Sequence, residues 1–218
     1  AAAGARVVVA VACRHSGRNC CAAGGLLSLA LCHSAARRAC KPGDLVLVVS
    51  SKPSARLHPS GYLAAVRALA GARVLTCAFI VAARTDAFTY HTATGLGRSD
   101  CWYREATKDD IAKVADGRGH ELTLRSRYRC NGDLQDHDWG NDMGAVLLAT
   151  SFFQADSRLK HAPRLPPSLL AVFDQWSGRG CKKLEPSTAG VVKRWMGRLE
   201  VLKGQAGAAL PAQCPRQP

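Results

Sequence analysis

The stretch Arg6–Gly25 reads RVVVAVACRHSGRNCCAAGG, and its order of residue types decides which fold we expect. The run from Arg6 to Ala12 is apolar without alternation, which is typical of a strand buried on both faces. A polar turn follows, in which Ser16 is a residue type that caps helices. We therefore predict a helix after Ser16, with an apolar stripe formed by Leu26, Leu27, Ala30 and Leu31. Nucleotide-binding α/β domains often begin in this way.

Two more apolar runs continue the pattern. The segment Lys41–Asp44 (KPGD) predicts a turn, and Leu45–Val49 predicts a second buried strand. A short helix is expected from Ser60, followed by a third buried strand over Arg73–Ala82. Strands that alternate with helices run parallel through right-handed crossovers. We therefore predict an α/β fold, a doubly wound, mainly parallel sheet with helices on both faces and an irregular C-terminal extension.

The second half of the chain is less regular. We predict a short helix from Thr107–Asp110, which resembles a capping box, and a half-exposed edge strand over Glu121–Tyr128. A loop over Asn131–Asn141 and a buried strand over Gly144–Phe153 are expected next. A short strand over Ser168–Phe173 and a final helix from Ser187 complete the prediction. These elements suggest two parts, an α/β sandwich domain over residues 1–175 and a basic C-terminal helix and tail over residues 176–218.

The composition is that of a folded and strongly basic protein. The chain has 218 residues, 47% of them hydrophobic, which is enough for one core. No apolar run approaches the ~20 residues that span a bilayer. The net charge is +14, with 12 Lys/Arg against 2 acids in residues 1–99 and 11 against 4 in residues 143–218. Such a balance favours contact with a polyanion or with an acidic protein surface.

The ten cysteines include no CxxC pair and no repeated spacing. Small secreted disulfide domains are denser in cysteine, so we expect most of these thiols to be reduced and buried, in an intracellular protein. The Ala-rich beginning suits the remainder of a cleaved targeting peptide, which would favour the mitochondrion, but it equally suits an arbitrary boundary of the sequence.

Several segments, taken in order, resemble the universal stress protein family, a doubly wound α/β fold. Val9–Ser16 (VAVACRHS) is similar to the first strand and turn of that family, and Gly43–Val49 is similar to its second strand. Gly144–Ser151, then Lys160–Pro163 (KHAP) and Leu169–Val172, resemble its late strands. The resemblance covers roughly residues 6–52 and 120–173, and the order of the pieces is more specific than any one of them.

This resemblance implies a nucleotide site, but two features depart from the pattern. Ala12 stands where the family has an acidic residue. The expected Gly-rich phosphate loop reads Ala149–Gln154, without glycine and with Phe152 and Phe153 where backbone N–H groups would approach phosphate. We therefore expect a retained fold with a lost or altered site, in which Arg14 and Ser16 are the residues that could still bind an anion. No cofactor is predicted.

Other candidate sites are weaker. The acidic segment Asp133–Asp142 contains His137, and carboxylates with a histidine can bind Mg²⁺ or Zn²⁺ or act as acid and base. The same segment is equally typical of a solvated loop that pairs with arginine. The Gly-containing loop Thr94–Ser99 lacks the strand and helix that give phosphate loops their function. The cysteines and histidines near the N-terminus match no zinc spacing.

Two sets of basic residues are candidates for partner binding. Arg125, Arg127 and Arg129 alternate along one face of a predicted strand, where they could contact RNA or simply protect a sheet edge. Lys193, Arg194 and Arg198 flank the apolar stripe of the final helix. That helix could dock on a partner or pack on its own sheet.

From the sequence alone we predict a non-enzymatic accessory or scaffold subunit of a larger, organellar assembly. Its partners would be other protein subunits, with RNA as a further candidate. Two alternatives stay open, a nucleotide-binding module of the universal stress type and a metal-dependent enzyme that uses the acidic segment 133–142.

Overall fold

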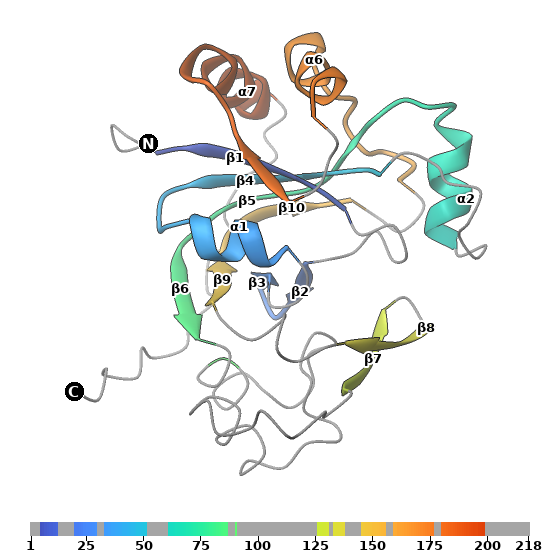
Figure 1. Ribbon diagram of the computed structural model, residues 1–218, viewed down its shortest axis with the longest axis vertical. Helices are drawn as coiled ribbons and strands as arrows, with labels where there is room; N and C mark the ends of the chain where they lie inside the picture. The colour runs from blue at the N-terminus through green and yellow to red at the C-terminus, as the bar shows by residue number, and fades with distance from the viewer. Residues whose placement is uncertain are drawn as a thin grey trace.

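A computed structural model shows a fold of three layers (Figure 1). It describes residues 5–12, 20–29, 33–51, 61–86, 90, 126–130, 133–137, 145–155, 159–176 and 180–198. The central layer is a five-stranded sheet in the order β10-β5-β4-β1-β11. Its strands are β10 (Ser151–Gln154), β5 (Leu75–Ile80), β4 (Leu45–Val49), β1 (Val7–Val11) and β11 (Cys181–Lys183).

The prediction of a doubly wound, mainly parallel sheet is wrong. Only β1 and β4 pair in parallel within this sheet, whereas β11, β5 and β10 each pair antiparallel with a neighbour. The helix α2 (Gly61–Ala68) lies beside the strand ends and does not cross the sheet, so the chain enters β5 at the end where it left β4 (Figure 1). Val49 therefore pairs with Leu75, and the strand direction reverses.

The prediction of a helix after Ser16 is also wrong for residues 20–29, which include the apolar residues Leu26 and Leu27. Residues 20–29 form a hairpin of β2 (Cys21–Ala23) and β3 (Leu26–Leu29), while Ser16 lies outside the described residues. The two residues of the turn are Gly24 and Gly25, with φ of +59° and +74°. A two-residue turn with positive φ at both positions matches the twist of a hairpin, and glycine adopts it without strain.

A four-stranded sheet in the order β2-β3-β9-β6 forms the third layer, with β9 (Ala145–Ala149) and β6 (Ala83–Asp86). The predicted strand Gly144–Phe153 is thus two strands, β9 and β10, which belong to different sheets. The chain passes from β5 to β6 in the same way, and the Ala82 N–H donates to the Leu148 carbonyl at 2.8 Å. The two sheets are therefore joined by a bent antiparallel ribbon.

The expected strand Ser168–Phe173 is a helix, α6 (Pro167–Asp174). A strand was predicted because Pro163, Pro166 and Pro167 precede this segment and proline breaks the interior of a helix. Pro166 occupies the N-cap position with extended backbone, and Pro167 opens the first turn. Proline is favoured at this position because the first N–H groups of a helix have no intrahelical partner and its φ is already helical. The prolines here mark where the helix begins.

The final helix, α7 (Pro186–Arg198), begins where the sequence predicted. Its buried residues are Ala189, Val192, Trp195 and Met196. They pack with Leu169 and Phe173 of α6 against Val7, Val9 and Leu47 of the central sheet. The helix therefore packs on the protein's own sheet. Leu184 and α7, which follow the expected division at residue 175, contribute to this core.

The opposite face of the central sheet is buried against the second sheet. Val8, Val46 and Phe79 point into this layer, where they meet Leu27 and Leu147. The short helix α1 (Ser34–Ala39) packs beside β9, where the Arg37 side chain donates to the Ala145 carbonyl at 3.1 Å. The strands β1 and β4 are thus buried on both faces, as their unbroken apolar runs predicted.

A separate antiparallel pair is formed by β7 (Ser126–Cys130) and β8 (Asp133–His137). The edge strand predicted over Glu121–Tyr128 overlaps β7, whereas β8 lies in a segment expected to be a loop. The helix predicted from Thr107 lies outside the described residues.

The predictions about cysteines and membrane spans can be compared over the described residues. Cys40 and Cys77 are free and buried, and Cys181 is free and half-buried, as expected for reduced thiols, while Cys20 is also buried. In the same part of the chain, no helix has the length and apolar character that a bilayer crossing requires.

We expect Trp195→Ala to lower the free energy of unfolding by about 3–5 kcal/mol, because it empties a large volume between α7 and the sheet. Arg198→Ala, an exposed change on the same helix, should alter it by less than about 0.5 kcal/mol. Urea unfolding followed by circular dichroism measures both. Equal midpoints for the two variants would show that α7 does not pack as described.

Candidate functional site

The residues expected to bind a nucleotide follow the end of β1. Ala12 is buried, and its N–H donates to the Val49 carbonyl at 2.7 Å, so it continues the β1–β4 pairing. Arg14 and Ser16 lie outside the described residues. Whether they bind an anion stays a prediction.

The segment expected to replace a phosphate loop, Ala149–Gln154, is almost entirely strand. Phe152 packs toward the layer between the two sheets, and Phe153 packs toward the helices. The backbone of β10 pairs with β5 from Ser151 to Gln154. The N–H groups that pair with β5 are therefore committed to the sheet and not arranged around an anion.

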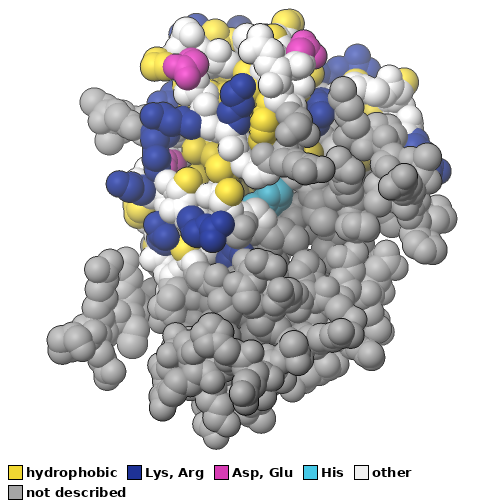
Figure 2. Space-filling view, viewed as in Figure 1, with side chains coloured by type: hydrophobic (Ala, Val, Ile, Leu, Met, Phe, Trp, Pro, Cys, Tyr) yellow, Lys and Arg dark blue, Asp and Glu magenta, His cyan; other side chains and the backbone are white. Residues whose placement is uncertain are grey.

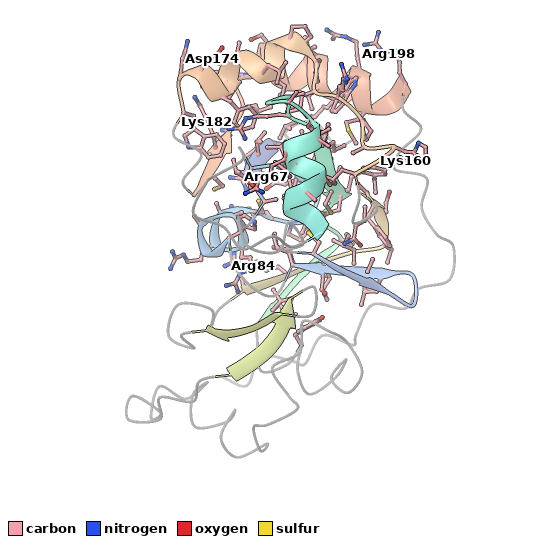
Figure 3. All side chains as sticks on the ribbon, turned by 90° about the vertical axis from the view of Figure 1, so that its right-hand side faces the viewer. Arg67, Arg84, Lys160, Asp174, Lys182 and Arg198 are labelled. Atoms are coloured by element: carbon pink, nitrogen blue, oxygen red, sulfur yellow. The ribbon has the colours of Figure 1, made fainter. Side chains whose placement is uncertain are left out.

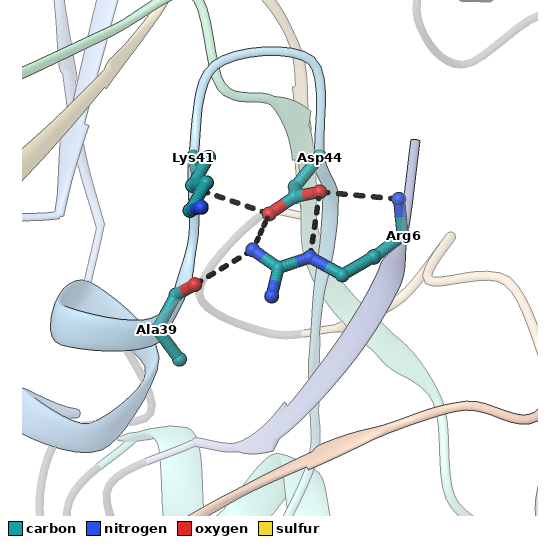
Figure 4. Close-up of polar contacts among 4 residues, drawn as sticks. All are labelled: Arg6, Ala39, Lys41 and Asp44. Carbon is teal, nitrogen blue, oxygen red and sulfur yellow. Dashed lines mark hydrogen bonds and ion pairs between the residues drawn. The ribbon is translucent and has the colours of Figure 1, made fainter. Parts of the chain in front are cut away.

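The most connected polar group in the described chain is the carboxylate of Asp44, in the turn before β4 (Figure 4). Its Oδ1 accepts from the backbone N–H and from Nε of Arg6, both at 3.1 Å. Its Oδ2 accepts from the Lys41 N–H at 2.8 Å and from the terminal guanidinium nitrogen of Arg6. The same nitrogen donates to the Ala39 carbonyl at 2.7 Å. One carboxylate thus joins the start of β1, the end of α1 and the turn into β4.

Two opposing effects act on the pKa of Asp44. Burial disfavours the charged carboxylate, but hydrogen bonds from the Arg6 side chain and from the backbone N–H groups of Lys41 and Arg6 favour it more, and the pKa lies below its usual range. Since a carboxylate has about four lone-pair sites and all are used here, Asp44 has none left for a substrate or a metal. Its role is structural.

His33 precedes α1 with backbone in the left-handed region, at φ +46°. Its carbonyl accepts the Arg37 N–H at 3.0 Å. Nε2 of its ring is buried without a hydrogen-bond partner in the described chain. Burial, followed by the positive charge of Arg37, lowers the pKa of His33 to about 4. The ring is therefore neutral near pH 7.

Two of the described thiols, those of Cys40 and Cys181, are poor nucleophiles. Burial is the main reason that the pKa of Cys40 is raised to about 12, and it also raises the pKa of Cys181. Thiolate is the reactive form of cysteine, so both side chains are protonated and unreactive at neutral pH. Among the described residues, no three His, Cys, Asp or Glu side chains come together as metal ligands would.

Basic side chains gather on one face of the molecule, over α1, β6 and β11 (Figure 2). We use the name basic face for the cations that these elements and the turn after α1 carry, which are Arg38, Lys41, Arg84, Lys182 and Lys183. Lys182 and Lys183 are consecutive in an edge strand, so their side chains leave β11 on opposite sides of the sheet. All five cations are exposed except Lys182, which is half-buried. Figure 3 shows Arg84 and Lys182 toward the same side of the molecule, whereas Lys160 and Arg198 lie toward the other. None of the five forms an ion pair with an acidic side chain of the described chain.

The predicted partner-binding residues are separated by the fold. On α7, Arg194 and Arg198 are exposed, while Lys193 is half-buried and its Nζ donates to the Ala5 carbonyl at 2.7 Å. Arg127 and Arg129 are positions of β7, where Arg127 pairs in register with Asp136 of β8.

Arg125 lies outside the described residues, as does the part of the acidic segment after His137. The site proposed for a metal-dependent enzyme is therefore described only in its first five residues, as β8.

Sequence reasoning missed the basic face because its residues are far apart in the chain. The available signal was the pair Lys182–Lys183 in a three-residue strand, together with Arg38 before the KPGD turn and Lys41 at its start. Charge counts alone do not show that these segments meet.

No family model, curated protein or solved structure matches the chain.

We expect Asp44→Asn to lower the free energy of unfolding at pH 7 by about 1–3 kcal/mol, since an amide cannot accept from all four donors. Asp174→Asn, an exposed change on α6, is the control. Because the folded pKa of Asp44 is depressed, its contribution is present above the unfolded value near ~3.9 and is lost as the pH falls through the folded pKa. The difference between wild type and Asp44→Asn should therefore shrink below about pH 4, and a constant difference would contradict the assignment.

We expect His33 to make the wild type less stable as the pH falls from about 6.5 to about 4, because the unfolded chain takes up a proton that the folded chain does not. The loss should approach about 3 kcal/mol at most. His33→Asn should flatten this part of the profile, since asparagine tolerates positive φ and does not titrate. His161→Asn, at an exposed position, should keep the wild-type slope. Thermal melts of the three proteins at several pH values measure this dependence. If stability falls with pH equally in all three, His33 does not have this role.

Proposed function

We propose that this chain is a non-enzymatic accessory or scaffold subunit of a larger assembly. The observation that supports it most is the pair of exposed arginines on α7, Arg194 and Arg198, whose helix is already anchored on the opposite side by Trp195 and Met196. A helix held in this way presents fixed charges without a cost in ordering the backbone.

The charges on α7 fit an acidic protein surface. Arg194 and Arg198 are four residues apart, so they lie on one side of the helix and repel each other by a few tenths of a kcal/mol. Neither forms an ion pair with an acidic side chain in the described chain. A carboxylate-rich surface would relieve this repulsion and bind each guanidinium through two parallel hydrogen bonds.

The chemistry of the buried polar groups agrees with a structural role. The Asp44 carboxylate is saturated by donors, the His33 ring is neutral and the Cys40 thiol is protonated. Each holds elements together or fills the core. The intracellular, mitochondrial location and the alternative functions stay predictions.

The assembly is tested by isolating the tagged full-length protein from its own cells and measuring its native mass. We expect a mass well above the 23.2 kDa of the chain, with the same partners recovered in fixed ratio. Arg194→Glu with Arg198→Glu should release the partners, whereas Arg67→Glu with Arg164→Glu, both exposed elsewhere, should not. A chain that runs alone at its own mass would refute the proposal.

A further inference from the structure

The basic face has no role in the fold that explains its charge. Arg38, Arg84 and Lys183 are exposed, and none of their side chains donates a hydrogen bond or forms an ion pair within the described chain. Among the residues whose side chains the structure describes, the acids are Asp44, Asp174 and Glu185, and the first of these is neutralised by Arg6. Among the described side chains of this face, cations therefore outnumber acids, although exposed acidic side chains also lie on it (Figure 2).

The elements that carry the basic face are held rigidly together. The Ala39 carbonyl at the end of α1 accepts from Arg6, which begins the strand that pairs with β11. A Cβ placed at Gly180, just before β11, would lie 3.9 Å from the Cβ of Ala35 in α1. The cations of α1 and β11 therefore keep a fixed spacing, which lowers the entropic cost of binding a ligand that touches several of them.

The surface is unlike the centre of a protein–protein interface. Such centres are rich in exposed aromatic and aliphatic side chains and poor in charge. Among the described residues, the large apolar side chains that are exposed are Ile80 and Leu170, at 38% and 37%, and neither belongs to the basic face. Interfaces with nucleic acids are instead polar and positively charged.

We propose that the basic face binds the phosphodiester backbone of a nucleic acid without reading its sequence. Arg38 and Arg84 offer the planar fork that fits a phosphate, and Lys41, Lys182 and Lys183 act as point charges. Backbone binding of this kind releases counterions and depends strongly on salt. The proposal goes beyond membership of an assembly, since it concerns a different surface from Arg194 and Arg198.

The test uses the purified full-length chain with fluorescently labelled duplex RNA, single-stranded RNA and duplex DNA of mixed sequence, read by anisotropy over a range of salt. We expect binding in the micromolar range or tighter at ~50 mM salt. The variant Arg38→Ala, Lys182→Ala and Lys183→Ala should lose at least about tenfold in affinity near ~0.1 M salt and reduce the slope of log affinity against log salt by about 2–3. Comparison of the three probes shows which nucleic acid is preferred.

The matched control is Arg67→Ala, Arg164→Ala and Arg198→Ala, three exposed arginines outside the basic face, which should keep the wild-type salt slope to within about 1. Circular dichroism melts show that both triple variants are folded. Absence of saturable binding, or an equal loss in the control, would overturn the proposal. Polyglutamate of equal charge that competes as well as RNA would also overturn it, in favour of an acidic protein. Because the isolated chain is used, these outcomes are independent of whether it joins an assembly.

Discussion

The carboxylate of Asp44 is the constraint on which the rest of the fold depends. Its four hydrogen bonds join the first residue before β1 to the turn that begins β4, and so set the register of the one parallel pair. That pair is the centre of the five-stranded sheet, and β5 and β11 add to its two sides. The same turn places α1 against β9 and thereby brings the second sheet under the first. A buried acid can do this because every lone pair has a donor.

The strands of the central sheet could be predicted from sequence, but their direction could not. Unbroken apolar runs at Val7–Val11 and Leu45–Val49 mark burial on both faces. Such runs are typical of parallel sheets covered by helices. Here one face is covered by α6 and α7, and the other by a second sheet. The apolar pattern is the same in both cases, because a valine side chain is buried equally well by a helix or by another strand.

The errors in assigning helices come from residues with two opposite meanings. The helix predicted after Ser16 includes Gly24 and Gly25, whereas a glycine pair between two short apolar runs is also typical of a hairpin turn. Pro167 was interpreted as a helix breaker, whereas it opens α6. Glycine is compatible with a helix or with a hairpin turn, and proline can end a helix or begin one. The packing around the residue determines which structure forms. Leu27 and Leu29 decide it for the hairpin, since they lie beside β9 in the second sheet and pack against Val8 and Phe79 of the central sheet.

The sequence predicts the net charge of the protein, but it does not predict where in the fold the charged side chains lie. Counting gives a basic protein, yet α1 and β11 are more than a hundred residues apart in the chain and lie side by side only because β11 adds to the edge of β1. Lys193 looks equivalent to Arg194 in sequence, but its ammonium group is used by the Ala5 carbonyl. The fold therefore sorts the cations into those that hold elements together, such as Arg6 and Lys193, and those left exposed. Since the buried acid is already neutralised, the exposed cations set the potential that a partner meets.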